Sequence, residues 1–412
     1  MTNFATLNDL DVKGRRVLVR SDLNVPVQDG VISDATRIDR GSITIAELSA
    51  AGAKVIVLSH FRRPLGQRIP EMSLRPVAKG LSDALGGKAV AFSDDCIGEV
   101  AIKAVAAMKN GDILLLENVR FHKGEEANDP EFAKSLAALG DLYVNDAFSC
   151  AHRAHASTEA LAGLLPSAAG RNMEAELSAL DSALGTPERP VAAVVGGAKI
   201  SSKLELLTSL VDKVDTLVIG GAMANTFLQA RGFSVGTSLC EPDLVAVART
   251  IDLRASATAC DLVLPFEVVI AESLTEGAPT RTISAGEVPE DMMILDVGPA
   301  AVSETVRRLT LCKTVVWNGP MGAFEIPPFD AGTNAVAQAV GTLCRQGDLL
   351  AVAGGGDTVS ALTNAGVADE FTYLSTAGGA FLEWLEGKEL PGVAALSKAA
   401  AKAPAQENLA QV

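Results

Sequence analysis

Short apolar runs alternate along the chain with longer stretches in which apolar residues recur every three or four positions. The runs are RVLVR (16–20), KVIVLS (54–59), DILLLEN (112–118), DLYVND (141–146), PVAAVVGG (190–197), DTLVIGG (215–221), DLVLP (261–265), MMILDVG (292–298), TVVWNG (314–319) and DLLAVAGG (348–355). Their near-continuous apolar character predicts strands buried on both faces. Stretches such as 43–52 and 203–214 have the spacing of helices that connect parallel strands. We therefore expect an α/β fold of doubly wound, mostly parallel sheets with helices on both faces.

The length of the chain predicts two such domains. At 412 residues it exceeds the roughly 250–300 residues at which a single core stops growing. Residues 172–187 have the apolar spacing of a helix, which Gly185 and Pro187 would end. We expect this segment to be a stiff connector between residues 1–171 and a second domain that begins at residue 188.

Composition and charge narrow the classes of partner. The net charge is −15 and aromatic residues make up only 4 % of the chain, so neither a broad basic face nor a set of stacking platforms for nucleic acid is expected. No apolar run reaches the ~20 residues of a membrane span, and the N-terminus does not have the pattern of a signal segment. The six cysteines include no CxxC pair. We expect reduced thiols, a cytoplasmic location and no nucleic-acid or membrane partner.

Cationic side chains in the first half follow the predicted strands. Because parallel strands of a sheet end at one edge, these side chains should converge, and guanidinium groups fit phosphate or carboxylate oxygens. Each residue taken singly has a structural alternative: an Asx turn, a solvated surface charge or a core histidine. The set as a whole favours a site for a small anion. Its candidate residues are Asp22, Asn24, Arg37, His60, Arg63, Arg120, His152 and Arg153.

The second half has no histidine and carries glycine-rich turns after its strands instead. The turn GGAK (196–199) would offer free amides to phosphate, and Lys199 and Lys203 lie four residues apart, which on a helix places both on one side. We expect Glu325 to contact ribose hydroxyls. In GGGDT (354–358), Asp357 could serve Mg²⁺ and Thr358 a phosphate. A solvated turn aspartate is the alternative. Gly378 and Gly379 would open a helix and form a third amide-rich site.

Taken in order, these motifs closely resemble the phosphoglycerate kinase family from about residue 7 to residue 396. The motifs are RSDLNVP (20–26), SHFRRP (59–64), LLLENVRF (114–121), NDAFSCAHRAHAS (145–157), VVGGAKISSKL (194–204), WNGPMGAFE (317–325), AVAGGGDT (351–358) and STAGGAFLEWLEGKELPG (375–392). The resemblance implies a monomeric, bilobal glycolytic enzyme that moves a phosphoryl group between 1,3-bisphosphoglycerate and MgADP, giving 3-phosphoglycerate and ATP. It also implies direct in-line transfer after the lobes close about a hinge.

The resemblance assigns roles by motif. The residues implied to hold the phosphoglycerate are Asp22, Leu23, Asn24, Arg37, His60, Phe61, Arg62, Arg63, Arg120, His152 and Arg153. Those implied to hold the nucleotide are Gly197, Lys199, Lys203, Gly221, Gly298, Gly319, Glu325, Gly354, Gly355, Gly356, Asp357 and Thr358, with Asp357 also serving Mg²⁺. Those implied to stabilise the moving phosphoryl group are Arg37, Lys203, Gly378 and Gly379. The acceptor carboxylate has an ordinary pKa near 4, so no general base is needed.

The resemblance also completes the domain organisation. Residues 1–171 would bind 3-phosphoglycerate, 172–187 would form the interdomain helix, 188–380 would bind the nucleotide, 381–396 would return to the first domain, and 397–412 would be a tail, either flexible or a docked helix. Phe61 and Arg62 stand where the family usually has Leu and Gly, so two adjacent arginines compete for one role, and the neighbouring proline favours Arg63. Ser149 replaces a usual glycine.

Two other functions fit the same pattern. One is another bilobal carboxylate kinase whose basic cluster is tuned to a different acid. The other is a bilobal binding protein for a small anion, which has no catalytic activity.

Overall fold

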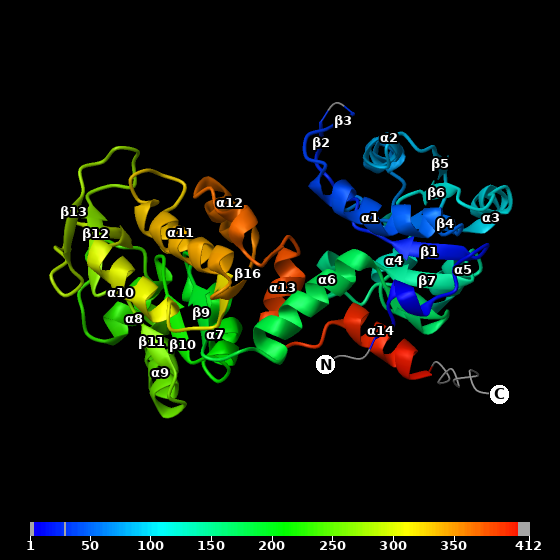
Figure 1. Cartoon of the computed structure of the whole chain (residues 1–412). Helices are drawn as coiled ribbons and strands as arrows, with labels where there is room; N and C mark the ends of the chain where they lie inside the picture. Colours follow the sequence, from blue (N-terminus) through cyan, green and yellow to red (C-terminus); the bar gives the residue numbers. More distant parts are fainter. Residues whose placement is uncertain (1–3, 29, 403–412) are drawn as a thin grey trace, which may run out of the picture. The chain divides into compact units, whose positions relative to one another are not determined.

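The computed structural model describes residues 4–28 and 30–402, and the chain divides into two compact units. Within the described residues, unit 1 takes those up to Leu177 together with those from Glu389 onward, and unit 2 takes Ser178–Lys388. Each unit has its own sheets and its own core. Figure 1 labels their helices and strands.

Unit 1 is built on a parallel sheet of six strands in the order β5-β6-β4-β1-β7-β8. The strands are β1 (Arg16–Arg20), β4 (Lys54–Leu58), β5 (Val90–Ser93), β6 (Ile113–Leu116), β7 (Leu142–Asn145) and β8 (Ser167–Ala169), and a separate hairpin joins β2 (Val27–Gln28) to β3 (Val31–Ile32). The helices are α1 (Thr36–Ala50), α2 (Arg75–Ala84), α3 (Gly98–Ala106), α4 (Lys123–Glu126), α5 (Pro130–Ala137) and α14 (Pro391–Lys402). Shorter 3-10 turns are η1 (Leu7–Asp9), η2 (Pro70–Met72), η3 (Val119–Phe121), η4 (Phe148–Cys150) and η5 (Ala160–Gly163).

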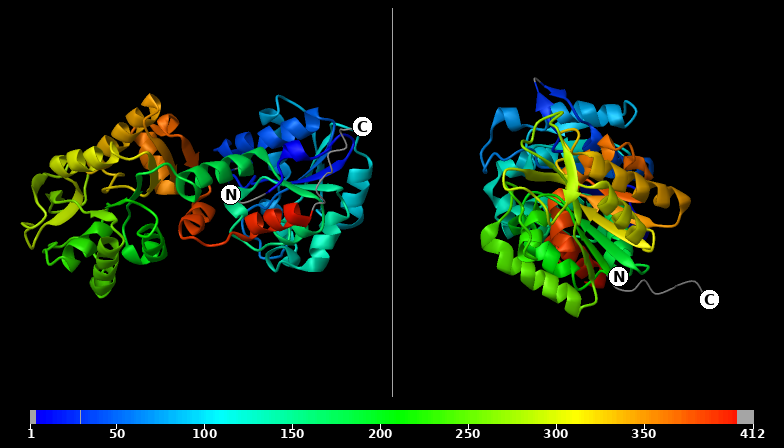
Figure 2. Two further views of the ribbon diagram at one scale, coloured as in Figure 1. Left: turned by 60° about the horizontal axis from the view of Figure 1, so that its bottom comes forward. Right: turned by 90° about the vertical axis from the view of Figure 1, so that its left-hand side faces the viewer.

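The central strands of this sheet are buried on both faces, which explains their unbroken apolar sequence. In β1, Val17 and Val19 join a cluster with side chains of α1 and α2, whereas Leu18 points the other way, into a cluster with α3, α5 and α14. Successive side chains of a strand face opposite sides, so each strand needs apolar residues at nearly every position. Figure 2 shows α14, in red, lying against the other elements of unit 1, and its contacts are with η5 and β8.

Unit 2 repeats this architecture with a parallel sheet in the order β11-β10-β9-β15-β16-β17. Its strands are β9 (Val191–Val195), β10 (Thr216–Ile219), β11 (Asp261–Val263), β15 (Thr314–Asn318), β16 (Leu350–Gly354) and β17 (Tyr373–Ser375). Its helices are α7 (Leu204–Leu210), α8 (Met223–Ala230), α9 (Val245–Ala257), α10 (Pro299–Leu309), α11 (Ala331–Gln346), α12 (Gly356–Asn364) and α13 (Gly378–Leu385), with 3-10 turns η7 (Ile200–Lys203), η8 (Pro242–Leu244) and η9 (Ala368–Glu370). The predicted fold class is confirmed in both units.

One predicted strand of unit 2 lies in a different sheet. The run MMILDVG contains β14 (Met293–Val297), which pairs antiparallel with β12 (Glu267–Ala271), and β12 pairs antiparallel with β13 (Arg281–Ser284). The expectation that this run is buried on both faces is wrong, because the first three residues of β14, Met293 to Leu295, are only partly buried. An apolar run gives no information about the direction of its neighbours, so the sequence did not separate this sheet from the parallel one.

The segment expected to connect the domains is helical. Helix α6 (Arg171–Leu180) continues into a single π-helical turn, η6 (Asp181–Gly185). Near the other end of the chain, helix α14 continues six residues beyond Leu396, to Lys402. The start of the expected tail is therefore helical. Residues 403–412 lie outside the described part of the chain. The domain boundaries proposed from the sequence stay predictions. Among the described residues, no helix combines the length and apolarity that crossing a bilayer requires.

Candidate active site

In unit 1, four neighbouring strands end at one edge of the sheet and carry the predicted anion-binding residues. Strand β1 leads into Asp22 and Asn24, β4 into His60, β6 into Arg120 on η3, and β7 into His152 and Arg153 beyond η4. Since β6, β4, β1 and β7 are adjacent and parallel, residues up to 130 positions apart in the sequence are brought together. We call this set, with Arg37 and Arg63, the basic cluster.

Asp22 is the acidic member around which one side of the cluster is organised. Its Oδ2 accepts hydrogen bonds from Arg37 Nη1 at 3.0 Å and from Ser149 Oγ at 2.5 Å, and Arg37 Nη1 also donates to the main-chain oxygen of Asn24 at 3.1 Å. The side chain of Arg37 is still 39 % exposed. These contacts account for an arginine at the positive N-terminal end of α1, where the helix dipole disfavours it.

His60 is buried and lies beside an arginine that the sequence did not single out. Arg20 is 1 % exposed, and its Nη2 lies 3.0 Å from His60 Nδ1 while its Nε donates to Ser157 Oγ at 2.9 Å. Burial lowers the pKa of His60 well below its ordinary value, and the charges of Arg20, Arg120, Arg153 and Arg37 lower it further. His60 is therefore a neutral imidazole at pH 7. The charges of four arginines therefore act on one ring.

The three arginines at 62, 63 and 120 differ in how far they are already engaged. Arg120 is buried, its Nη1 donates to the main-chain oxygen of Arg62 at 2.7 Å, and its Nε lies 3.2 Å from Glu126 Oε1. The side chain of Arg62 donates to the main-chain oxygen of Val27 and lies over the ring of Phe61. Arg63 is exposed, and among the described residues its guanidinium has no hydrogen-bond partner. Its donors are therefore free to meet a ligand.

The remaining residues of the predicted set differ in how deeply their side chains are buried. His152 and Arg153 are both partly buried, and burial, followed by the charge of Arg153, lowers the pKa of His152. Leu23 and Phe61 are almost fully buried, so only their main chains could face a ligand. The other two histidines lie beside acidic side chains: His122 Nε2 is 2.7 Å from Asp95 Oδ1, and His155 Nδ1 is 3.9 Å from Glu125 Oε1.

In unit 2, four of the twelve predicted nucleotide residues line a cavity of about 470 Å³. Gly197, Gly221, Glu325 and Asp357 line it, together with apolar side chains such as Leu274 and Phe324. Such a cavity, apolar with a few polar groups at its wall, is typical of sites for small organic ligands. Asp296, which the sequence reasoning did not consider, also lines it. The lining does not include the other eight predicted residues, which are Lys199, Lys203, Gly298, Gly319, Gly354, Gly355, Gly356 and Thr358. Gly298 instead packs against Glu267 at the start of α10.

Lys203 lies just beyond this cavity and is held by three oxygens. Its Nζ donates to the main-chain oxygens of Gly196 and Asn318 and to Asn318 Oδ1. Burial lowers the pKa of Lys203 to about 8, although the charge of Asp357 acts in the opposite direction. The expectation that Lys199 and Lys203 share one side of an α-helix is wrong. Lys199 has an extended backbone and precedes a 3-10 turn, because α7 begins only at Leu204.

The glycines of unit 2 allow its loops to approach one another closely. A Cβ on Gly319, whose φ is +104°, would lie 2.1 Å from the main-chain oxygen of Gly196, and one on Gly221, at φ +66°, would lie 2.6 Å from that of Gly197. These glycines are therefore required for loop packing whether or not they also touch a ligand.

Two helices begin at the predicted glycine sites. Helix α12 begins at Gly356, directly after Gly354 and Gly355, and α13 begins at Gly378 and Gly379. The hydroxyl oxygen of Thr358 accepts a hydrogen bond from the main-chain N–H of Gly319 at 2.7 Å. This bond ties the α12 turn to the loop after β15.

Two residues with central contacts were missed from the sequence. Arg20 closes the apolar run RVLVR, and Asn318 follows Trp317 at the end of β15. A charged or amide side chain at the last position of a fully buried strand is the signal that could have identified both, because such a group needs a polar partner at the sheet edge.

Taken together, unit 1 presents a compact basic site for a small acid and unit 2 a glycine-rich cavity for a larger ligand, which is the arrangement of a kinase with one substrate on each α/β unit. The phosphoglycerate kinase family model matches residues 7–388. The phosphoglycerate kinase of Rhodospirillum centenum is 61 % identical over 393 residues, covering 95 % of this chain and 99 % of the relative, and that of Agrobacterium fabrum is 59 % identical over 400 residues, covering 97 % and 100 %. The chain belongs to the phosphoglycerate kinase family.

The solved structures agree with this assignment. The structure of phosphoglycerate kinase from Coxiella burnetii has a TM-score of 0.90 with 41 % identity and covers 97 % of this chain and 100 % of its own. That from Pyrococcus horikoshii has a TM-score of 0.79 with 28 % identity, covering 96 % and 99 %. The protein is thus a glycolytic phosphotransferase that exchanges a phosphoryl group between 1,3-bisphosphoglycerate and ADP. This function replaces the two alternatives drawn from the sequence.

Proposed function

We propose that the basic cluster of unit 1 binds 3-phosphoglycerate and that the cavity of unit 2 binds the nucleotide. The convergence of four strand ends on one buried, neutral histidine and its surrounding arginines carries the first assignment. Carboxylate is a planar oxygen anion and phosphate a tetrahedral one, and guanidinium groups bind either of them through paired hydrogen bonds. Asp22 and Asn24 add acceptors that could receive the hydroxyl of the acid. The contacts are proposed for the residues named by motif, with Arg63 and not Arg62 in the one place for which these two arginines compete.

The histidines of this cluster would act as hydrogen-bonding groups and not as bases. His60 and His152 both have lowered pKa values, owing first to burial, so neither carries a charge at neutral pH. In the direction that consumes ATP, a carboxylate oxygen of 3-phosphoglycerate forms the new P–O bond while the bond to ADP breaks. That carboxylate is already ionised, because its ordinary pKa is near 4. The chain then needs only to position the reactants and neutralise charge.

The charge on the moving phosphoryl group would be neutralised from both units. We assign this role to Arg37, to Lys203 and to the amides of Gly378 and Gly379 at the start of α13. For Lys203 this requires that its ammonium exchange one of its three protein acceptors for a phosphoryl oxygen.

The nucleotide would bind with Mg²⁺. Asp357 fits the ion, because it offers an exposed carboxylate at the cavity wall, and Mg²⁺ favours one or two carboxylates together with phosphate oxygens. Bound there, Mg²⁺ would supply charge neutralisation to the phosphates.

Two adjacent arginines provide a sharp test of the proposed acid site. Arg63→Ala should raise the KM for 3-phosphoglycerate about tenfold or more, the value of one lost charged contact. Arg62→Ala is the matched control, because the Arg62 side chain already bonds to Val27 and lies over Phe61. The measurement is a coupled assay with 3-phosphoglycerate varied at saturating ATP. Equal effects of the two substitutions, or a larger effect of Arg62→Ala, would reject the assignment.

Further proposals concern closure and state in solution. Direct in-line transfer needs the two bound ligands to meet, so we expect hinge bending, and the scattering curve of the enzyme with both ligands should differ from that of the free enzyme. Identical curves would count against closure.

We also propose a cytoplasmic monomer. Light scattering that gave twice the mass of the 42.5 kDa chain would contradict the monomer.

A further inference from the structure

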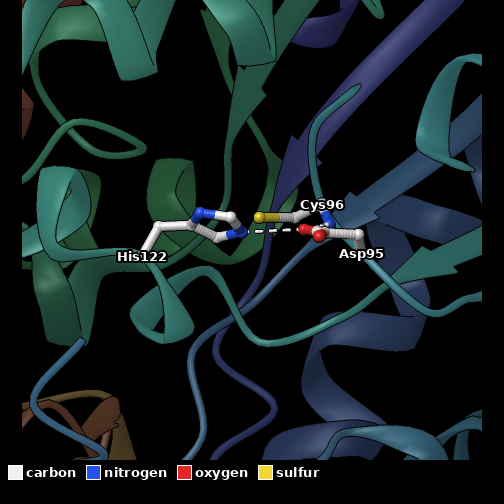
Figure 3. Close-up of side chains that lie close together, drawn as sticks. All are labelled: Asp95, Cys96 and His122. Carbon is white, nitrogen blue, oxygen red and sulfur yellow. Dashed lines mark hydrogen bonds and ion pairs between the residues drawn. The ribbon is translucent and has the colours of Figure 1, made fainter. Parts of the chain in front are cut away.

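A second polar cluster of unit 1 shares no residue with the basic cluster and includes no residue to which we assign a role in phosphoryl transfer. Asp95 and Cys96 lie in the loop that follows β5, and His122 lies between η3 and α4. Figure 3 shows the three side chains pointing toward one another from these two segments. One ligand atom from each residue lies within 4.8 Å of the others, and within residues 4–28 and 30–402 they form the one group of three or more such side chains at this spacing.

We propose that Asp95, Cys96 and His122 bind a divalent transition-metal ion of the zinc class. The three residues offer one carboxylate, one thiolate and one imidazole, which are the ligand types that Zn²⁺ takes in proteins. Mg²⁺ and Ca²⁺ do not fit this set, since they prefer oxygen ligands throughout. The fourth tetrahedral position would be left to water.

The spacing of the ligand atoms suits a tetrahedral ion. Metal–ligand distances of about 2.0–2.3 Å place tetrahedral ligand atoms about 3.2–3.6 Å apart. His122 Nε2 and Asp95 Oδ1 now lie 2.7 Å apart in a hydrogen bond, so they would separate by about half an ångström on binding, while the three atoms stay within the present 4.8 Å. The change is within the reach of side-chain rotation.

Access to the cluster is one-sided. The side chains of His122 and Asp95 are 29 % and 32 % exposed, so an ion and its water can approach from solvent. Cys96 is fully buried and closes the inner side. The ring of His122 stacks on Phe132 with 5.2 Å between the ring centroids, which holds the imidazole in place. A fixed imidazole and a dry inner wall are features that favour a defined site.

The surroundings are acidic, which favours a cation. Asp95 is itself a carboxylate, and Glu125 and Glu117 lie close enough for their charges to act on Cys96. The same negative charges would attract a divalent ion. On binding, the sulfur–hydrogen bond gives way to a sulfur–metal bond and the proton passes to solvent, so no oxidant or reductant is needed.

The competing interpretation is purely structural. The His122–Asp95 hydrogen bond joins two loops, and Cys96 also belongs to the apolar cluster beneath the sheet. The two interpretations make different predictions for the Cys96 sulfur when a thiophilic metal is added. A metal site forms a sulfur–metal bond, whereas a purely structural cluster does not.

Cobalt titration of the full-length enzyme separates them. Co²⁺ is added in a phosphate-free buffer without nucleotide, because phosphates bind metal ions themselves. We expect one Co²⁺ per chain, with the near-ultraviolet absorption of a thiolate–cobalt bond and the visible bands of a tetrahedral ion, and displacement of both by one equivalent of Zn²⁺. Absence of the thiolate–cobalt absorption at one equivalent would overturn the proposal.

Variants locate the signal. Cys96→Ser should abolish the thiolate absorption, and His122→Gln, a change at a partly exposed residue, should weaken binding at least about tenfold. Cys312→Ser is the matched control, since Cys312 is a buried free cysteine in unit 2 outside any such group among the described residues. Circular dichroism and turnover should be retained in all three. Persistence of the absorption in Cys96→Ser, or its loss in Cys312→Ser, would reject the site.

Discussion

Lys203 Nζ donates hydrogen bonds to both oxygens of Asn318, at 2.9 Å to the main-chain oxygen and at 2.5 Å to Oδ1. Asn318 in turn donates from Nδ2 to the main-chain oxygen of Gly354 at 2.7 Å. One amide side chain therefore links the ammonium proposed to act in transfer with the turn at the start of α12. From this link we expect Asn318 to position the ammonium group of Lys203.

Asn318→Ala should lower kcat more than it raises the KM for ATP. The substitution removes one acceptor from Lys203 and leaves the main-chain oxygen of Gly354 without its buried partner, a loss of about 1–3 kcal/mol and thus about tenfold to a hundredfold in rate. Steady-state kinetics in the ATP-consuming direction measure it. Asn334→Ala is the control, because within the described residues the side chain of Asn334 bonds only to Asp330, the residue before α11. A kcat equal to that of the wild type would show that Asn318 does not position Lys203.

The rate should fall as pH rises through about 8. Lys203 has a pKa lowered to about 8 by burial, so it is protonated below that pH and loses its charge above it. In the free enzyme, kcat/KM should therefore decline about tenfold for each pH unit above 8. Because the pKa values of His60 and His152 are lowered, neither histidine should add a step between pH 7 and 8.

Lys203→Arg identifies the group responsible. An arginine keeps its charge far above pH 9, so the residual activity of this variant should lack the decline near 8. If the variant shows the same decline as the wild type, the titrating group is not Lys203.

Arg20→Met should destabilise unit 1 strongly. Arg20 is buried, bonds to Ser157 and Ser21 and faces His60, so its removal leaves buried polar groups without partners, at a cost of about 3–5 kcal/mol. Arg16→Met is the matched control on the same strand. Arg16 pairs with Asp141 at 2.6 Å, but both side chains are about one-third exposed, and such a pair contributes about 1 kcal/mol or less.

Hydrogen exchange of peptides from β1, β4 and β7 distinguishes the two variants. We expect much faster exchange in Arg20→Met and a small change in Arg16→Met. Similar protection in both would mean that Arg20 contributes no more than a surface arginine.

Asp296 should make the stability of unit 2 depend on pH. Burial raises the pKa of Asp296 to about 7, against about 4 in an unfolded chain. Its Oδ2 accepts from the main-chain N–H of Gly332, while Oδ1 is buried with no hydrogen-bond partner among the described residues. The folded state therefore binds the proton more tightly. Its contribution to stability is fully present below pH 4 and is lost as pH rises to 7, up to about 4 kcal/mol.

Asp296→Asn should remove this dependence. Between pH 4 and 7, the free energy of unfolding of the wild type should fall relative to that of the variant, because only the wild type must ionise a buried carboxyl group. Urea unfolding followed by tryptophan fluorescence measures it in unit 2, because the two tryptophans, Trp317 and Trp384, both lie there. Asp348→Asn, a change at an exposed aspartate of the same unit, is the control. A difference that stays constant with pH would contradict the prediction.

Local patterns predicted the central strands of both parallel sheets, because burial on both faces leaves a direct trace in the sequence. The edge strands β5, β8 and β17 were not among the predicted runs. Every residue of β1 after Arg16 is buried, and its sequence is correspondingly apolar until Arg20. The same signal does not report strand direction, which is why the sequence did not distinguish β14 from the strands of the parallel sheet. Direction depends on which neighbour a strand meets, and that choice is made by tertiary packing.

The site was predicted where a residue lies just beyond a strand and missed where it lies on the strand's last position. His60 and Arg120 follow their strands, whereas Arg20 and Asn318 end theirs. The spacing argument for Lys199 failed for another reason. It assumed α-helical geometry in a segment that opens with an extended residue and a 3-10 turn, and glycine-rich turns leave that choice to the loops around them.

Because of helix α14, unit 1 is not fully translated until after unit 2. The helix packs on η5 and β8, yet it is separated from them in the sequence by the whole of unit 2. A ribosome therefore releases every residue of unit 2 before the last helix of unit 1 emerges. Until then the apolar surface that Ala395 and its neighbours cover remains open on the nascent chain, so the first domain to be translated is the last to be completed.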